Sequence, residues 1–181
     1  MLLLVPVFAW SCGMCAVAEI RPAAAPEYAI KAVFLYNLVK YTDWPPASPL
    51  SDPSAPIVLA VIGDDPFGAA LDEAVRDRTV RGRPIVIVRT SDLKALKSVH
   101  VAFICASESG RAGELVSSLA VRSVLTVGDT ESTARAGAAV NFIMVQGKVR
   151  FDVNQAAAKR RNIELSSQLL KLARRVLEPE G

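Results

Sequence analysis

Short apolar runs alternate with helix-like segments along this sequence, and no other feature restricts its fold as much. Residues 57–62 form a continuous apolar run, which is typical of a strand buried on both faces. Similar runs follow at 85–88, 99–105 and 124–127. Because alternating strands and helices connect by right-handed crossovers, they produce a mainly parallel sheet with helices on both faces. We therefore predict an α/β fold, a three-layer sandwich around a Rossmann-like sheet.

The first helix is predicted from the spacing of its apolar residues. Trp44-Pro45 ends it, because a residue before proline is pushed out of helical geometry. Lys31 and Lys40 lie off the predicted apolar stripe. The stripe consists of Ile30, Val33, Phe34, Asn37, Leu38 and Tyr41.

Later helices are predicted from capping residues. Asp65 suits the N-cap and Pro66 the first turn of a helix that runs to about Arg76. Further helical or turn segments are expected at 92–97, 111–119 and 131–136.

The last third of the sequence changes pattern. Residues 139–145 and 148–153, joined by a Gln146-Gly147 turn, predict an antiparallel β-hairpin. Two helical segments are then expected, at 154–161 and at 166–177, the second capped by Ser166 or Ser167.

The N-terminus has the pattern of a cleavable signal peptide. Residues 1–18 contain an apolar run and end in Ala16-Val17-Ala18, an A-x-A cleavage site. Residues 19–26 are then expected to be a flexible lead, and residues 27–181 a single domain. Cys12 and Cys15 would be removed with the leader, so neither a metal site nor a redox pair is assigned to them. Cys105 remains and is expected to be a buried, inert thiol.

Charge and motifs exclude several function classes. The formal net charge of +3 does not require a nucleic-acid or membrane partner. The sequence contains no P-loop and no dinucleotide-binding fingerprint, so no cofactor is assigned. His100 is the one histidine and lies in an apolar run, which favours a hydrogen-bonded core residue over a catalytic base. We assign no catalytic residue and no metal ligand.

Polar residues follow several predicted strands. In open α/β sheets ligands bind at the carboxyl ends of strands, so these residues form a candidate cleft for a polar metabolite. The alternative is that acids such as Asp65 and Asp129 only cap helices and turns. A metal-dependent enzyme using the same acids is a third hypothesis. The cleft residues are Asp64, Arg89, Glu108 and Asp129.

The predicted C-terminal helix is apolar over more than one stripe. Leu165, Leu169, Leu172 and Val176 share one face, and further apolar residues widen it. This width fits either tight packing on the sheet or a dimer or partner interface.

The motifs of the chain, taken in order, resemble those of the YfiR-type (DUF4154) family. They span residues 27 to 176, nearly the whole of the predicted mature chain. The matching segments are EYAIKAVFLYN (27–37), WP (44–45), GDDPFG (63–68), HVAFI (100–104), SE (107–108), VLTVGD (124–129), NF (141–142), RFDVN (150–154) and SSQLLKLA (166–173).

The resemblance implies a periplasmic regulator that works by binding, not by catalysis. The best-understood member of the family represses a membrane-bound diguanylate cyclase by binding its periplasmic region, which lowers cyclic di-GMP. That member is dimeric and carries disulfides, whereas the mature part of this chain has Cys105 alone. We therefore expect a homodimer that binds the periplasmic domain of an inner-membrane cyclase or sensor kinase. The expected contact residues are Phe151, Ile163, Leu169 and Leu172, with Arg160 and Arg174 as charge partners.

Overall fold

An eight-stranded sheet forms the centre of the fold, in a computed structural model that describes residues 25–45, 52–93, 98–120 and 122–178. The predicted signal peptide, most of the lead and most of the segment expected at 92–97 lie outside the described residues. The strand order is β10-β8-β7-β6-β5-β2-β4-β3. The strands are β2 (Ile57–Ile62), β3 (Thr79–Val80), β4 (Arg83–Thr90), β5 (Val101–Ile104), β6 (Leu125–Gly128), β7 (Val140–Val145), β8 (Lys148–Asn154) and β10 (Arg175–Leu177).

The sheet is mainly parallel, as predicted. Strands β4, β2, β5, β6 and β7 run in one direction. The predicted hairpin is present as the antiparallel pair β7–β8, and β10 runs parallel to β8 at the edge. A separate two-stranded sheet joins β1 (Thr42–Asp43) to β9 (Glu164–Leu165).

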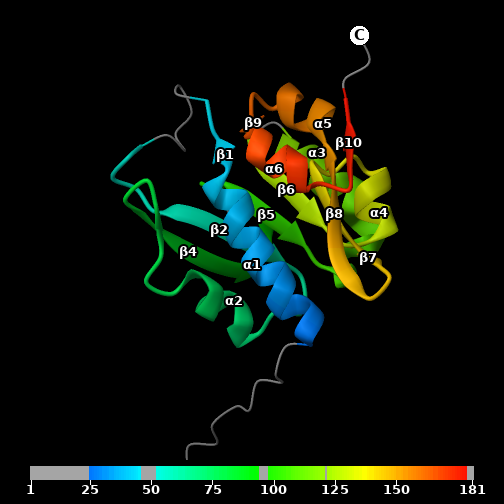
Figure 1. The fold of residues 1–181 in the computed structure, drawn as a ribbon, viewed down its shortest axis with the longest axis horizontal. Coiled ribbons are helices and arrows are strands. Elements are labelled where there is room, and N and C mark those ends of the chain that lie inside the picture. The colour runs from blue at the N-terminus through cyan, green and yellow to red at the C-terminus, as the bar shows by residue number, and fades with distance from the viewer. Residues whose placement is uncertain (1–24, 46–51, 94–97, 121, 179–181) are drawn as a thin grey trace, which may run out of the picture.

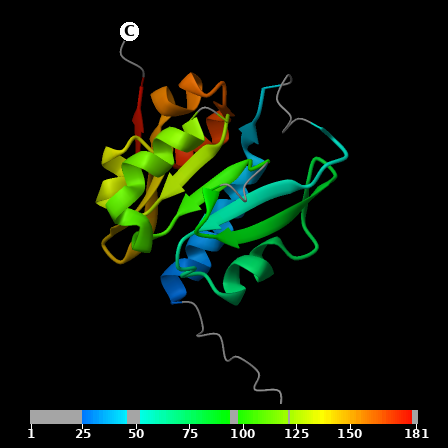
Figure 2. The same ribbon diagram turned by 180° about the vertical axis from the view of Figure 1, so that it is seen from behind.

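Helices cover both faces of the sheet, which confirms the three-layer sandwich. The front layer in Figure 1 contains α1 (Pro26–Lys40), α2 (Ala69–Val75) and α6 (Ser167–Leu172). The view from behind in Figure 2 shows α3 (Ala112–Ala120) and α4 (Glu131–Arg135) over the opposite face. Helix α5 (Gln155–Arg160) follows the hairpin, and a 3-10 helix (Ala106–Arg111) leads into α3.

Alternate residues of the central strands supply two cores. Leu59, Val61 and Phe103 pack beneath α1 and α2, whereas Ala60 and Ile104 pack with α3. Each large side chain that is fully buried in this way stabilises the fold by about 1.5–3 kcal/mol.

Helix α1 is present, but its predicted apolar stripe is wrong in part. Ile30 and Val33 are 48% and 47% exposed, while Lys31 is buried. The reason is an ion pair, because Lys31 Nζ reaches the buried carboxylate of Asp129, 2.7 Å away. That contact requires the helix face with Lys31 to point at the sheet.

The start of α2 also differs from the prediction. The helix begins at Ala69, after Gly68 in a left-handed conformation (φ 53°), and not at Pro66. Asp65 is engaged elsewhere, since its Oδ1 accepts the backbone N–H of Phe67 and its Oδ2 binds Arg89.

The predicted C-terminal helix is half as long as expected. Ser166 caps α6 as predicted, with its Oγ accepting the N–H of Leu169. The chain becomes extended at Ala173 and then forms β10. The edge of β8 explains this change, because the N–H of Arg174 donates to the carbonyl of Phe151 and the Arg174 guanidinium binds both oxygens of Asp152.

Gly128 allows α4 to pack closely on the end of β6. A Cβ atom at Gly128 would overlap the side chain of Thr133, with Thr133 Cγ2 only 2.8 Å away. Thr133 is buried, forms a capping box with Thr130, and lies 2.8 Å from Asn141 Oδ1 through its hydroxyl. Neither side of this contact can move without breaking hydrogen bonds.

We expect Gly128→Ala to lower the free energy of unfolding by about 1–3 kcal/mol, because overpacking forces side chains and backbone to shift. Urea denaturation measures the change. The matched control is Gly113→Ala, where the added methyl group meets nothing within 4 Å and the helix gains from the better helix former. A Gly128→Ala variant as stable as the wild type would contradict the steric argument.

Candidate functional site

Three of the four residues of the predicted ligand cleft, Arg89, Glu108 and Asp129, form ion pairs with neighbouring side chains. Arg89 forms ion pairs with two nearby carboxylates. Its Nε lies 2.6 Å from Asp65 Oδ2, and its Nη2 lies 2.7 Å from Asp72 Oδ2. Asp64 is held through its backbone N–H, which donates to Ser107 Oγ. Arg89 therefore joins the loop after β2 to α2, and its guanidinium is already engaged.

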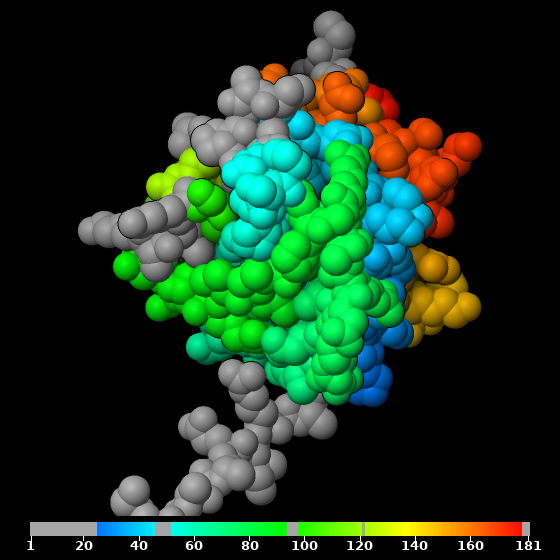
Figure 3. Space-filling view, turned by 90° about the vertical axis from the view of Figure 1, so that its left-hand side faces the viewer, coloured from blue at the N-terminus to red at the C-terminus, as the bar shows by residue number. Residues whose placement is uncertain are grey.

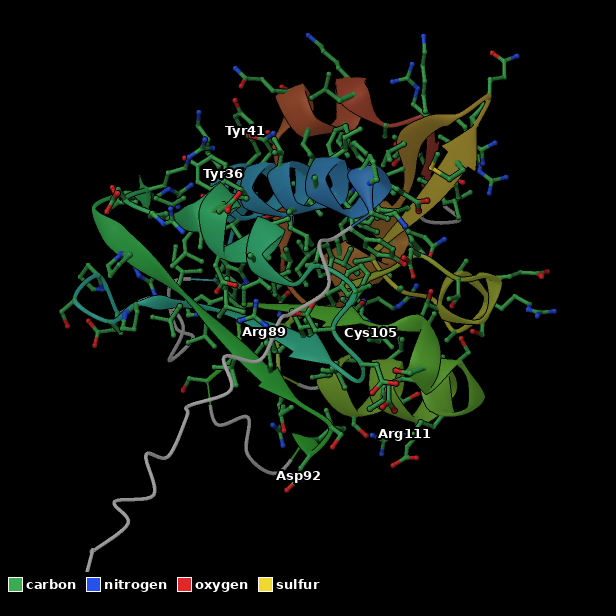
Figure 4. The ribbon with its side chains drawn as sticks, turned by 90° about the horizontal axis from the view of Figure 1, so that it is seen from below. Tyr36, Tyr41, Arg89, Asp92, Cys105 and Arg111 are labelled. Carbon is green, nitrogen blue, oxygen red and sulfur yellow. The ribbon has the colours of Figure 1, made fainter. Side chains whose placement is uncertain are left out.

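Glu108 forms a second local pair. Its carboxylate binds Arg111 at the end of the 3-10 helix. Figure 4 shows Arg89, Cys105 and Arg111 spread out along this side of the molecule. Arg89 and Glu108, two of the residues expected to hold a ligand, are thus each paired with a neighbouring side chain of opposite charge.

Asp129 belongs to a third, buried cluster. Its Oδ2 accepts hydrogen bonds from Lys31 Nζ (2.7 Å) and from the Tyr28 hydroxyl (2.9 Å), and Lys31 also binds Glu27. The side chains of Lys31 and Asp129 are both 4% exposed. Burial and the Asp129 carboxylate raise the pKa of Tyr28, so the phenol stays protonated and donates. Asp129 therefore anchors a helix instead of capping one.

Cys105 is a buried thiol, as predicted. Burial, together with the negative charges of Asp65 and Asp129, raises its pKa to about 12. The thiolate is the reactive form of cysteine, so this side chain is inert near neutral pH. Within the described residues, no group of three His, Cys, Asp or Glu side chains is placed to hold a metal ion.

A groove that was not predicted lies between α4, the β7–β8 hairpin and β10. We call it the α4–hairpin groove, and its volume is about 690 Å³. Asp129 is the one member of the predicted cleft among its lining residues. Its walls come from sequence positions 129 to 177, so no local motif could indicate it. Lining residues include Arg135, Asn141, Ile143, Asp152, Arg174 and Leu177.

Three of the four predicted apolar contact residues are in the core. Phe151, Ile163 and Leu169 are each 1% exposed, so a partner cannot reach their side chains on the folded chain. Their assignment to a contact surface is wrong for this conformation, and a charged substitution at Ile163 or Leu169 would test folding instead of contact. Leu172 is different, because it is 59% exposed.

Other large apolar side chains are exposed on α1. Ile30 and Val33 lie on α1, on the same side of the sheet as α6 (Figure 1). Arg160 and Arg174 are exposed, as a role in charge pairing requires, although Arg174 already binds Asp152. No helix in the described part of the chain is long and apolar enough to cross a membrane.

We expect Lys31→Met to lower the free energy of unfolding by about 3–5 kcal/mol, because it leaves a buried carboxylate without a cation. Urea denaturation measures this change. The double variant Lys31→Met/Asp129→Asn should recover part of the loss, since no uncompensated charge is then buried.

Arg135→Met is the matched control, because it removes an ion pair in which both side chains are more than 70% exposed (73% and 80%), and stability should change little. Strictly additive effects of Lys31→Met and Asp129→Asn would show that the two side chains do not act as a pair.

Comparison with solved structures supports the fold. The ABC domain from Streptococcus pneumonia, in complex with L-Trp, is similar with a TM-score of 0.53 and 12% identity, over 80% of this chain and 60% of that one. A conserved domain protein from Vibrio cholerae O1 biovar El Tor N16961 gives a TM-score of 0.52 with 12% identity, again over 80% of this chain and 60% of that one. At this identity the likeness concerns the fold alone.

Comparison with sequences identifies the family. A search of curated proteins gives no match. The family model described as YfiR/HmsC-like matches residues 28–174, which covers every strand described above except β10 and every helix except the first two residues of α1. The chain therefore belongs to the YfiR/HmsC-like (DUF4154) family.

Proposed function

We propose that this protein represses a membrane-bound diguanylate cyclase by binding the periplasmic domain of that enzyme, and so lowers cyclic di-GMP. Membership of the YfiR/HmsC-like family supports a regulatory role in the periplasm. Members of this family are regulators and not known enzymes. Binding alone is sufficient for repression, because a partner that binds one conformation selectively shifts the equilibrium towards it.

The exposed leucine of α6 is the observation that carries this proposal. Leu172 is 59% exposed on a helix whose other face buries Leu169 in the core. Ile30 and Val33 of α1 are about half exposed on the same side of the sheet, at 48% and 47%. A contiguous exposed apolar patch marks a protein-binding surface, and we infer that these three side chains contribute to one.

Charge around these apolar residues favours an acidic partner. Lys40 at the end of α1 and Lys171 on α6 are exposed, as are Arg160 and Arg174. Rim charges act mainly on the rate and specificity of association, while the central apolar side chains provide most of the affinity. A homodimer is part of the proposal, with a sensor kinase as the alternative membrane partner.

We expect Leu172→Asp to weaken binding to the periplasmic domain of a membrane diguanylate cyclase by tenfold or more, about 1.4 kcal/mol, because it places a charge at an apolar contact. Calorimetric titration of the full chain against that domain measures the affinity. Val86→Asp is the matched control, since Val86 is 42% exposed but lies on β4, at the opposite end of the strand order from β8 and β10. In Figure 3 the green segment that contains β4 faces the viewer, and the orange C-terminal segment lies at the upper right-hand edge. Undiminished binding by a folded Leu172→Asp variant would remove α6 from the interface.

The α4–hairpin groove supports a second function, that of a small-molecule sensor. Its volume of about 690 Å³ lies within the range of ligand sites, and apolar Ile143 and Leu177 face it together with polar Asn141. One structural relative was crystallised with L-Trp, which makes L-Trp a sensible member of a ligand set. A ligand in this groove would contact β10 and α4, and could thereby tune partner binding.

A ligand of this groove should raise the melting temperature by about 5–10 °C at a hundredfold excess over its Kd, because it binds only the folded chain. A thermal-shift screen of polar metabolites, L-Trp included, measures this. Ala134→Trp fills the groove and should abolish the shift, whereas Ser117→Trp on the exposed side of α3 should not. An unchanged melting temperature across a broad set would count against the sensor function.

A further inference from the structure

Two hydrogen-bond donors approach the ring of His100 at the amino-terminal edge of the sheet. His100 directly precedes β5 and is 1% exposed. Its Nδ1 accepts the backbone N–H of Val58 at 3.0 Å, and its Nε2 lies 2.9 Å from Nη2 of Arg83. An amide N–H and a guanidinium can only donate, so both contacts require an unprotonated ring nitrogen.

A neutral imidazole has one unprotonated nitrogen, so it can satisfy only one of these two donors. Protonation makes the conflict worse. The second proton would face the Val58 amide or the Arg83 guanidinium, and the new positive charge would lie beside Arg83. These neighbours therefore favour the neutral form of the His100 imidazole over its protonated form.

Arg83 is fixed and cannot easily turn away. Its Nε donates to the carbonyl of Ala55 at 2.7 Å, and Nη2 also approaches the carbonyl of Pro56. Asp52, from the loop before β2, and Arg81, from the turn before β4, are among the charged groups that act on it. The position of Arg83 is therefore set by the backbone of the adjoining segment.

The indole of Trp44 contacts the imidazole of His100. The two rings pack edge to face, with ring centroids 5.3 Å apart and an interplanar angle of 83°. The indole Nε1 is buried, and among the described residues it has no hydrogen-bond partner. The indole also packs against the apolar core and lines a groove of about 710 Å³ together with Arg81 and Lys159.

We propose that His100 is an acid-sensitive latch, whose protonation releases the Val58 amide and displaces Trp44 from the amino-terminal edge of the sheet. The latch goes beyond the proposed function, because it gives the protein an input that needs no ligand. An unperturbed imidazole takes up a proton near pH 6.5. The unfolded chain therefore binds more protons than the folded chain below this pH, and stability falls as the pH drops through it.

Tryptophan fluorescence tests the latch directly. The sequence contains two tryptophans, so the full chain with Trp10→Phe reports on Trp44 alone. Its emission should change with a single transition between about pH 8 and about pH 5, the range in which histidine titrates. His100→Asn keeps an oxygen that can accept the Val58 N–H but cannot titrate there, and should abolish the transition.

Arg83→Gln separates the latch from a merely structural role of His100. Removing the cation beside the ring should move the fluorescence midpoint upwards, by about one pH unit. A flat wild-type profile, a His100→Asn profile equal to that of the wild type, or a midpoint that ignores Arg83→Gln would each overturn the proposal. None of these measurements uses a partner protein, so their outcome is independent of cyclase repression.

Discussion

The buried ion pair between Lys31 and Asp129 determines how the first helix lies on the sheet. It joins residues 98 positions apart, and Tyr28 adds a second hydrogen bond to the same carboxylate oxygen. Because two charges buried together are costly unless they meet, the helix cannot rotate away from this contact. Because the ion pair sets the rotation of α1 about its axis, Ile30 and Val33 are 48% and 47% exposed. A helix oriented by its apolar stripe alone would bury both side chains. The exposure of these two apolar side chains is thus a consequence of a polar contact in the interior.

Ion pairs also engage most of the charged side chains at the carboxyl-terminal edge of the sheet. Arg89, Glu108 and Asp129 each bind a neighbour of opposite charge, so each is neutralised within its own cluster. Side chains engaged in this way hold loops and helices in place. The open groove lies to one side, between α4 and the hairpin, where Asn141 and Ile143 supply a mixed polar and apolar wall.

The sequence predicted what depends on local pattern and missed what depends on distant partners. The apolar run at 57–62 is β2 to the residue, and the Gln146-Gly147 turn joins β7 to β8 as expected. The orientation of α1 could not be predicted, since it depends on Asp129. Residues 173–177 have helical spacing but form an extended segment and strand, because β8 offers them backbone partners and Asp152 offers Arg174 a carboxylate. Ile163 and Leu169 are also buried by tertiary packing, so the periodicity of the sequence could not predict their burial.

The amino-terminal edge of the sheet connects the histidine latch to the exposed leucine. Trp44 directly follows β1, and β1 pairs with β9 through Thr42 and Leu165. The N–H of Ser166 donates to the carbonyl of Tyr41, and Ser166 is the N-cap of the helix that carries Leu172. A displacement of Trp44 would therefore act on the strand pair that positions α6. Contiguous contacts alone do not couple two sites. Coupling also requires an element along these contacts that has two stable arrangements. Of the elements along these contacts, the imidazole of His100 is the one whose neutral and protonated forms make different demands on the same neighbours.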